Sequence, residues 1–451
     1  MEARVFERGE RVWMSKNCPR HGSQEVLIST DPGFYAQQRA MALRAGKPLR
    51  SNTETINGCP FDCGICPDHQ QHSCITLLEV TSNCNLSCPI CYADSSPRSG
   101  GHRSLETLCK MLDDIVQNEG QPDVVQISGG EPTTHPQIFE ILAAAKARPI
   151  RHLMLNTNGL RIAQSAEFAA KLAQFAPGFE IYLQFDSLAG EACKALRGRD
   201  LVSEKRQALD RLEALGLSTT LVVTVQRGVN DLELGQLIDF ALGYRCVRGL
   251  TLQPVQHAGR ATDYDPAQHR LTLSEVRQAV LDQHSLFEPA DIVPVPCHPD
   301  CLAMAYALKR EGRATPLTGL ISQQALIEAA SDTITLERHP AIRRELNDLL
   351  SAGHSPESAA AGLGRLLCCL PDLKSAATLS YENVFRVMIV QFMDAESLDV
   401  RSVKRSCITI ANPDGRVIPF DTYNLFYRDG LSLPESVAGR TVQLRRGPTQ
   451  P

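Results

Sequence analysis

Short apolar runs alternate with longer helix-like stretches between residues 75 and 255. Each run is continuously apolar, which is typical of strands that are buried on both faces of a parallel sheet. The predicted strands are 75–81, 123–127, 152–159, 180–187, 218–225 and 248–255. Repeated strand–helix units of this kind predict an α/β fold, a partial (β/α)6 barrel, with functional residues at the carboxyl ends of its strands.

The chain on either side of this barrel has a different character. The segment before it is rich in cysteine, and the segment after it includes a stretch, 322–374, that is helical by composition. A polar linker at 256–275 follows the last predicted strand. We therefore expect three regions, which are a cysteine-rich segment at 1–74, the barrel at 75–256 and a helical, cysteine-bearing region at 257–451.

Overall composition excludes several classes of protein. Of the 451 residues, 43% are hydrophobic and 22% are charged, which argues against disorder, and a net charge of -5 does not indicate a basic face for nucleic acid. No apolar run approaches the roughly 18 residues of a membrane span, and the first residues, MEARVFERGE, are charged where a signal peptide is apolar. We therefore expect a cytoplasmic protein with no nucleic-acid partner.

Cysteine is the residue type that departs most from ordinary composition. The chain has 16 cysteines, and in a protein without an export signal close clustering indicates metal binding before disulfide pairing. Two segments, CPFDCGIC from Cys59 and CNLSCPIC from Cys84, share the spacing C-x3-C-x2-C. Three thiolates on one tight loop can hold three irons of a [4Fe-4S] cluster.

The first of these loops has a fourth cysteine close behind it. Cys59, Cys63 and Cys66 are followed by Cys74, so four protein thiolates are at hand. This set predicts an auxiliary [4Fe-4S] cluster held entirely by protein, with a zinc site as the alternative.

The second loop, Cys84, Cys88 and Cys91, has no such partner. The next cysteine, Cys109, falls within a predicted helix and is badly placed to return to the loop. One iron of a cluster bound here would therefore stay open for a small ligand. A zinc knuckle is the alternative for this spacing taken alone.

A glycine motif follows the predicted strand 123–127. The segment SGGEPT places Gly129, Gly130 and Glu131 directly after that strand. A glycine pair at a strand end lets the backbone approach a ligand closely, here with a carboxylate beside it.

Together, CNLSCPICY and SGGEPT resemble the radical S-adenosylmethionine (SAM) superfamily. The resemblance implies that the open iron binds the amino and carboxylate groups of SAM. It also implies that one electron from the cluster cleaves SAM to methionine and a 5'-deoxyadenosyl radical, which abstracts hydrogen from the substrate. The cofactor-binding residues expected beside Cys84, Cys88 and Cys91 are Tyr92, Gly129, Gly130, Glu131, Asn158 and Asp186.

Two further groups of potential ligands lie near the ends of the chain. A second auxiliary cluster is expected from the C-terminal group, with core cysteines as the alternative. Its ligands would be Cys297, Cys301, Cys369 (or its neighbour Cys368) and Cys407. Near the start of the chain, Cys18 and His21 form half of a metal-binding knuckle, which cannot complete a mononuclear site by itself.

The cysteine motifs, QPVQHAGR, VPCHPDC and the segment from VMIVQF to NLFYR together resemble the tetraether synthase family, also described as 7,8-dihydro-6-hydroxymethylpterin methyltransferase-like. The resemblance implies a SAM cluster, two auxiliary [4Fe-4S] clusters and a rubredoxin-like iron site at the N-terminus. This chain departs from the family pattern in three places. It keeps only Cys18 and His21 of the N-terminal knuckles, it lacks a histidine shortly after Cys407, and Asp421 stands where cysteine is common.

The leading functional hypothesis is an enzyme that attacks an unactivated C–H bond, in the service of C–C bond formation on a lipid or other apolar chain. Its apolar substrate follows from the family resemblance. The alternatives are a radical SAM methylase with a pterin-type substrate, a peptide or small-molecule maturase and, from another class, a non-catalytic metal-cluster binding protein. The expected partners are a flavodoxin- or ferredoxin-type electron donor and, if the substrate is a lipid, a peripheral membrane contact.

Overall fold

The computed structural model describes residues 3–18, 22–41, 46–310, 313–319 and 384–428. The predicted helical stretch 322–374, with Cys368 and Cys369, lies outside the described residues.

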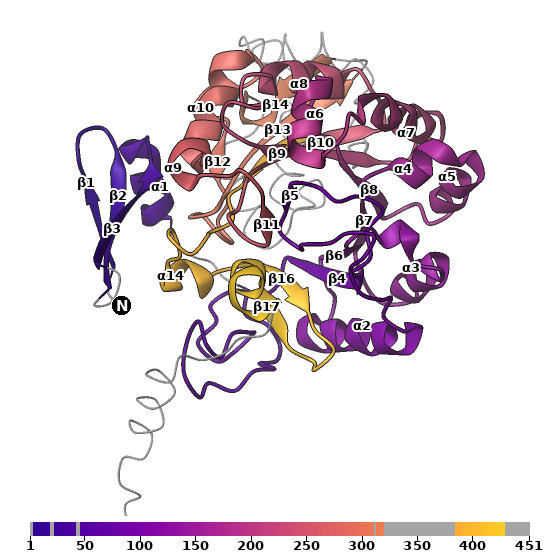
Figure 1. Ribbon diagram of the computed structural model, residues 1–451, viewed down its shortest axis with the longest axis horizontal. Coiled ribbons are helices and arrows are strands. Elements are labelled where there is room, and N and C mark those ends of the chain that lie inside the picture. The colour runs from indigo at the N-terminus through magenta and orange to yellow at the C-terminus, as the bar shows by residue number, and fades with distance from the viewer. Residues whose placement is uncertain (1–2, 19–21, 42–45, 311–312, 320–383, 429–451) are drawn as a thin grey trace, which may run out of the picture.

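A single large sheet forms the centre of the molecule (Figure 1). Its middle consists of parallel strands at the positions expected from the apolar runs, so the predicted α/β barrel fold is confirmed. These strands are β4 (Ile75–Thr81), β6 (Val124–Gly129), β7 (His152–Thr157), β8 (Phe179–Gln184), β9 (Thr219–Val225) and β10 (Val247–Pro254).

Helices cover the outer face of this sheet (Figure 1). They are α2 (Leu105–Glu119), α3 (Ile138–Lys146), α4 (Leu160–Gln164), α5 (Ala166–Ala173), α6 (Gly190–Arg197), α7 (Val202–Ala214), α8 (Leu234–Leu242) and α10 (Leu273–Gln283). Local sequence sets their ends: Ser104 caps the start of α2, and Thr272 forms a capping box with Glu275 at the start of α10. Alternate strand residues, such as Leu78 and Ile127, join the helices in one continuous core.

The C-terminal part of the chain pairs with both edges of the barrel sheet. Strand β15 (Val384–Val390) lies parallel to β10, and β16 (Ile408–Ala411) lies parallel to β4. Strand β13 (Leu302–Arg310) and β17 (Val417–Pro419) then extend the two sides as antiparallel neighbours. An open barrel leaves unpaired N–H and C=O groups at its two edges, and these strands satisfy them. The proposed division into three regions stays a prediction.

A small antiparallel sheet lies at one side of the barrel (Figure 1). It comprises β1 (Ala3–Glu7), β2 (Val12–Cys18) and β3 (Gly22–Ser29), followed by α1 (Pro32–Ala40). Hydrogen bonds fix it to the rest of the chain. The Thr30 N–H donates to Ser274 Oγ at 2.8 Å, and Gln38 Nε2 donates to the Pro299 carbonyl at 2.7 Å.

Within the part of the chain that the structure describes, no helix is both long enough and apolar enough to cross a membrane.

Candidate active site

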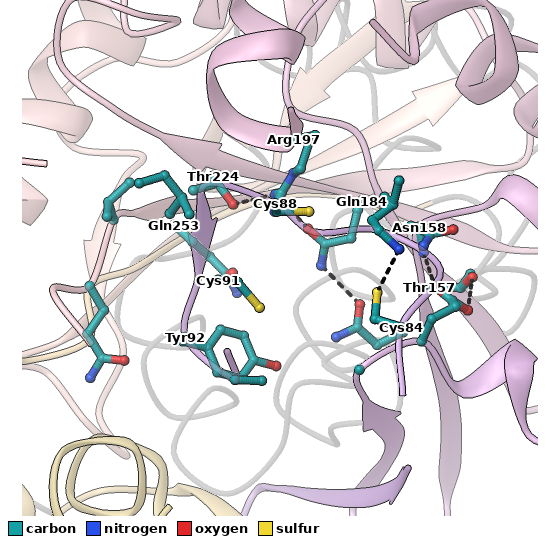
Figure 2. Close-up of a pocket in the computed structure, with 18 of the residues that line it drawn as sticks. Cys84, Cys88, Cys91, Tyr92, Thr157, Asn158, Gln184, Arg197, Thr224 and Gln253 are labelled. Atoms are coloured by element: carbon teal, nitrogen blue, oxygen red, sulfur yellow. Dashed lines mark hydrogen bonds between the residues drawn. The ribbon is translucent and has the colours of Figure 1, made fainter. Parts of the chain in front are cut away.

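The cysteines at 84, 88 and 91 line one cavity at the carboxyl ends of the barrel strands. The cavity has a volume of about 970 Å³, and Figure 2 shows the three sulfur atoms turned toward a common space. Cys84 follows β4, and Cys91 lies in the short strand β5 (Ile90–Cys91). Among the described residues that line the cavity there is no further cysteine or histidine. This donor set fits a [4Fe-4S] cluster with one iron open to a small ligand.

Burial keeps the Cys84 and Cys88 thiols protonated while no metal is bound. Burial raises the pKa of Cys84 to about 12. It also raises the pKa of Cys88, although the nearby Arg197 guanidinium opposes the shift. Metal binding must therefore supply the positive charge that stabilises the thiolates.

Gly129 and Gly130 let the turn after β6 lie directly against the start of the cysteine loop. A Cβ at Gly129 would stand 2.2 Å from the Thr81 carbonyl oxygen, and one at Gly130 would stand 2.3 Å from that of Asn83. The Gly130 N–H donates to Thr81 O at 2.8 Å. The close approach that these glycines permit is therefore to the backbone of the cysteine loop. Both glycines also line the cavity.

Glu131 connects this turn to the end of β7. Its carboxylate accepts hydrogen bonds from the Thr157 hydroxyl at 2.7 Å and from the Asn158 N–H at 2.7 Å. Thr133 donates to it through both its hydroxyl and its backbone N–H. Burial still raises the pKa of Glu131 above its usual range. Asn158 lines the cavity, and its side chain donates to Asn85 Oδ1 at 2.6 Å. Cofactor contacts of both residues stay predictions.

The structure places Asp186 behind the cavity rather than on its wall. Its carboxylate is fully buried and accepts from Arg197 Nε at 2.7 Å and from the Thr224 N–H at 3.1 Å. Burial alone would raise the pKa of Asp186, but the Arg197 guanidinium lowers it below its usual range. In the structure the carboxylate of Asp186 thus forms an ion pair with Arg197, and its contact with SAM stays a prediction.

Arg197 is a charged cavity residue that the sequence motifs do not predict. It lies at the end of α6, lines the cavity and forms a hydrogen bond with Cys88. Its Nη2 also donates to Thr224 Oγ1 at 2.8 Å and to Gln184 Oε1 at 3.2 Å (Figure 2). No motif surrounds Arg197 in the sequence. The only signal is a cation one helix after the strand that carries Asp186.

Comparison with known proteins agrees with this geometry. Residues 78–241 match the family model described as the radical SAM superfamily. The protein is a radical SAM enzyme. The family binds a [4Fe-4S] cluster and SAM, and in this chain Cys84, Cys88 and Cys91 would hold the cluster.

The radical SAM enzyme is also similar to individual proteins. It is 28% identical to a 7,8-dihydro-6-hydroxymethylpterin dimethyltransferase of Methanocaldococcus jannaschii over 96% of this chain and 93% of the relative. It is 31% identical to the mycofactocin maturase MftC of Mycobacterium ulcerans over 42% of this chain and 49% of the relative. Among solved structures, Streptococcus suis SuiB bound to S-adenosylmethionine matches with a TM-score of 0.38 and 16% identity over 46% of each chain.

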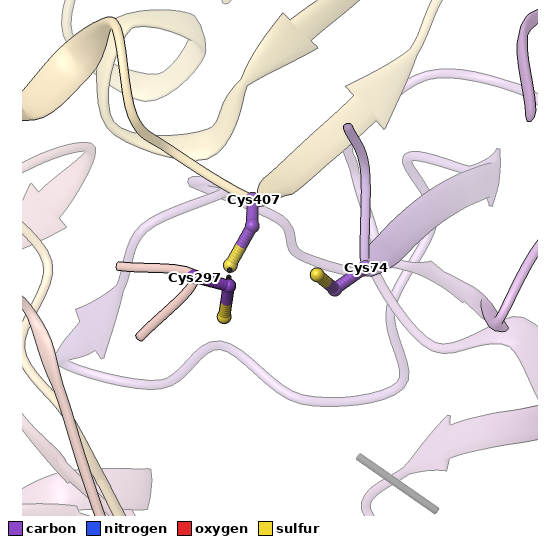
Figure 3. Close-up of side chains that lie close together, drawn as sticks. All are labelled: Cys74, Cys297 and Cys407. Carbon is purple, nitrogen blue, oxygen red and sulfur yellow. Dashed lines mark hydrogen bonds between the residues drawn. The ribbon is translucent and has the colours of Figure 1, made fainter. Parts of the chain in front are cut away.

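The radical SAM enzyme has a second group of cysteines, and its membership differs from the predicted sets. The sulfur atoms of Cys74, Cys297 and Cys407 all lie within 4.8 Å of one another, and all three residues are buried (Figure 3). The sequence predicts that Cys74 joins the loop of Cys59, Cys63 and Cys66. Cys74 and Cys407 instead precede the neighbouring parallel strands β4 and β16, so the sheet places them side by side.

Three thiols this close suit a metal ion or one side of a cluster. A zinc or iron ion with metal–sulfur bonds of about 2.3 Å holds sulfur atoms roughly 3.8 Å apart, and Cys297 and Cys407 sulfurs are 3.3 Å apart. Hydrogen bonds from Cys407 and Cys74 lower the pKa of the Cys297 thiol. Cys301, predicted for the same site, faces Ser402 Oγ at 3.5 Å and lines a different cavity.

The loop of Cys59, Cys63 and Cys66 lies against the C-terminal helical turns α15 (Phe420–Thr422) and Tyr423–Tyr427. Cys63 Sγ lies 2.9 Å from Thr422 Oγ1, and the Cys63 N–H donates to the Tyr427 hydroxyl at 2.8 Å. Without Cys74 the loop keeps three thiols. Its use as an auxiliary-cluster site stays a prediction.

The N-terminal sheet matches a second family model, described as an HMPTM N-terminal zinc ribbon domain, over residues 1–30. Within that range the sequence holds one cysteine, Cys18, and one histidine, His21. A structural zinc site uses four protein ligands, so this donor set does not fit the metal. Packing and hydrogen bonds to the barrel hold the sheet instead; Lys16 Nζ, for example, donates to the Ala395 carbonyl at 3.3 Å.

Proposed function

We propose that this radical SAM enzyme abstracts a hydrogen atom from a compact, flat heterocycle of the pterin class, as a step toward C–C bond formation on that substrate. The observation that carries the proposal is a second cavity inside the barrel, with a volume of about 610 Å³, next to the cysteine cavity. The residues that line both cavities are Tyr92, Asn156, Gln184, Gln253, Phe392 and Phe420.

Amide side chains surround the border between the two cavities. Gln184 Nε2 donates to Asn156 Oδ1 at 3.0 Å, and Gln253 Nε2 donates to the Tyr182 hydroxyl at 3.2 Å. Each amide still has donor or acceptor capacity to spare, because it carries two donors and two lone pairs. The edge of a pterin ring offers matching donors and acceptors. A purely apolar chain would leave these remaining donors and acceptors unpaired, at about 1–3 kcal/mol for each group.

Aromatic rings supply a flat surface at the same border. The ring centroids of Phe392 and Phe420 are 3.9 Å apart in a stacked arrangement, and Tyr92 meets Phe420 edge-on at 4.9 Å. A planar heterocycle can lie against such rings with little loss of conformational entropy. The name of the relative that matches along 93% of its length, a pterin dimethyltransferase, supports the same substrate class.

When bound at Cys84, Cys88 and Cys91, the cluster and SAM supply a 5'-deoxyadenosyl radical that takes a hydrogen atom from the substrate. The protein's part is placement and exclusion of water. Arg197 and Lys205 line the cysteine cavity, where they would provide positive charge for the carboxylate of a bound ligand. Leu86 and Ile90 are buried beside the cysteines and keep that side apolar.

An apolar chain is the second candidate substrate because the second cavity is largely apolar away from its border with the cysteine cavity. Its walls there include Leu77, Met154, Met388 and Ile408. C–C bond formation on a lipid, peripheral membrane contact and a flavodoxin- or ferredoxin-type donor all stay predictions.

The test is an anaerobic assay with reconstituted protein, SAM and dithionite. Separate arms contain 7,8-dihydro-6-hydroxymethylpterin, a lipid extract, a peptide mixture or no addition, and 5'-deoxyadenosine and new substrate-derived masses are measured. Pterin should raise deoxyadenosine formation and yield a pterin-derived product of changed mass, and Gln253→Leu should weaken this response more than the exposed-site control Gln278→Leu. A response to lipid or peptide with none to pterin would overturn the proposal.

A further inference from the structure

The segment Gln256–Arg260, QHAGR in the sequence, lies directly on the cysteine loop. It leads into the two-residue strand β11 (Arg260–Ala261), which pairs antiparallel with β5. In this pairing Arg260 lies opposite Cys91. Figure 1 shows β5 and β11 as neighbours at the mouth of the barrel. A segment distant in sequence thus pairs with the backbone of a predicted cluster ligand.

The Arg260 side chain holds two points of the loop at once. Its Nε donates to the Cys88 carbonyl at 2.6 Å, and its Nη2 donates to the Ser95 carbonyl at 2.6 Å. Its Nη1 donates to Asp94 Oδ1 at 2.7 Å, which balances the charge. A rigid guanidinium with several donors is suited to joining carbonyls from different parts of a turn.

Gly259 brings the two backbones into contact just before Arg260. Its φ of +60° lies in the left-handed region. A Cβ at this position would stand 2.4 Å from the Tyr92 carbonyl oxygen and 2.6 Å from that of Cys91. Both its left-handed conformation and the close approach require glycine. On the far side of β11, the Thr262 N–H donates to the Pro89 carbonyl at 3.0 Å.

We propose that Arg260 is a positioning residue for the cluster: by fixing the carbonyls of Cys88 and Ser95, it sets the separation and orientation of the Cys88 and Cys91 thiols. Without these bonds the loop between Cys88 and Ser95 loses the guanidinium that binds its backbone carbonyls. The inference concerns how the cluster is held and does not depend on which substrate the enzyme uses.

Arg277 offers a matched control elsewhere in the fold. It also donates to two carbonyls, those of Pro289 at 2.6 Å and Ile292 at 3.3 Å, and it also pairs with a carboxylate, Asp31. Its partners lie outside the cysteine cavity. Loss of Arg277 therefore removes a comparable set of structural bonds without touching the loop.

The experiment compares full-length Arg260→Ala, Arg260→Lys, Gly259→Ala and Arg277→Ala with the parent chain. In apo protein, alkylation of Cys88 and Cys91 is followed by peptide mass spectrometry. After reconstitution, iron content, the electron paramagnetic resonance spectrum with and without SAM, and the KM for SAM are measured.

Arg260→Ala and Gly259→Ala should speed alkylation of Cys88 and Cys91 by about tenfold or more, lower bound iron by up to about four atoms per chain and weaken the spectral change caused by SAM. Arg260→Lys should fall between the parent and Arg260→Ala, because an ammonium cannot reproduce the fork of the guanidinium. Arg277→Ala should leave all these readouts unchanged. Parent-like alkylation and spectra in Arg260→Ala, or equal losses in Arg277→Ala, would overturn the proposal.

Discussion

Cys74 and Cys407 each precede a strand of the central sheet, and their sulfur atoms lie within 4.8 Å of each other because β4 and β16 are parallel neighbours. The pairing register aligns Ile75 with Ile408, and the Ile75 N–H donates to the Cys407 carbonyl at 3.1 Å. The sheet therefore brings together two cysteines that are far apart in the sequence.

This relationship predicts which cysteine substitutions remove the same metal. Cys74→Ala and Cys407→Ala should each abolish one auxiliary metal site, and the double variant should lose no more iron or zinc than either single variant. Cys74→Ala combined with Cys59→Ala should lose more than Cys74→Ala alone if the CPFDCGIC loop binds its own metal. Elemental analysis and sulfide counting of anaerobically purified protein measure this.

Two control variants complete that comparison. Cys246→Ala removes a buried cysteine from outside the three cysteine groups and should leave the metal content unchanged. Cys88→Ala should abolish SAM cleavage while leaving the auxiliary metal. Additive losses in Cys74→Ala with Cys407→Ala would show that the two residues serve different sites.

The barrel could be predicted well from the sequence because the patterns that mark its strands and its cysteine loop are local. Continuous apolar runs marked each central strand, and the spacing of Cys84, Cys88 and Cys91 placed three thiols on one loop. The partner of Cys74 could not be predicted in this way, because it depends on which distant strand fills the open edge beside β4. Proximity in the sequence favours Cys66 as the partner of Cys74, whereas the pairing of β4 with β16 places Cys407 beside it.

Buried electrostatic partners were also beyond the reach of motif analysis. Asp186 at a strand end looked like a ligand-binding residue, but its partner Arg197 comes from the following helix. The inward-facing amides Gln126 and Gln253 lie on different strands, β6 and β10, that are far apart in the sequence. Their common cavity becomes visible only when the strands are assembled into a barrel.

Gly130 should tolerate no side chain, because a Cβ would stand 2.3 Å from the Asn83 carbonyl oxygen. Gly130→Ala should push the turn after β6 away from the cysteine loop and raise the KM for SAM at least about tenfold, equivalent to roughly 1.4 kcal/mol. Gly101→Ala is the matched control, since a Cβ there would meet nothing within 4 Å. Steady-state kinetics and thermal unfolding of both variants test this; a parent-like KM in Gly130→Ala would contradict it.

Glu180 forms a buried ion pair deep in the barrel with Arg386 Nη2 at 3.3 Å and a hydrogen bond with His152 Nε2 at 2.9 Å. Burial alone would raise the pKa of Glu180, but Arg386 and His152 lower it from 4.5 to about 2. The folded state therefore binds this proton more weakly than the unfolded state. The resulting stabilisation is complete above about pH 4.5 and is lost as the pH falls toward 2.

Glu180→Gln should accordingly lower the free energy of unfolding by about 3–5 kcal/mol at pH 7, because Arg386 would stay buried without this carboxylate charge. The difference from the parent should shrink as the pH falls through the window between 4.5 and about 2. Urea unfolding of apo protein at several pH values measures it. Glu167→Gln, which removes an exposed pair with Lys171, should have little effect. A pH-independent difference would contradict the assignment.

Asp186 and Arg197 should act as one unit beside Cys88. Asp186 holds the guanidinium through Nε at 2.7 Å, and Arg197 in turn forms a hydrogen bond with Cys88. Hydrogen bonds to cluster sulfurs and nearby charge raise the reduction potential of iron–sulfur clusters. Arg197→Gln should therefore lower the potential of the SAM cluster and slow SAM cleavage.

Asp186→Asn should shift the same quantities in the same direction, because the arginine loses the charge that orients it. The double variant should be no worse than Arg197→Gln alone, since the two side chains act through one contact. Redox titration followed by electron paramagnetic resonance measures the potential, and Lys194→Gln, on the exposed side of α6, is the control. If the effects of the two substitutions simply add, Asp186 acts on the site by a route other than Arg197.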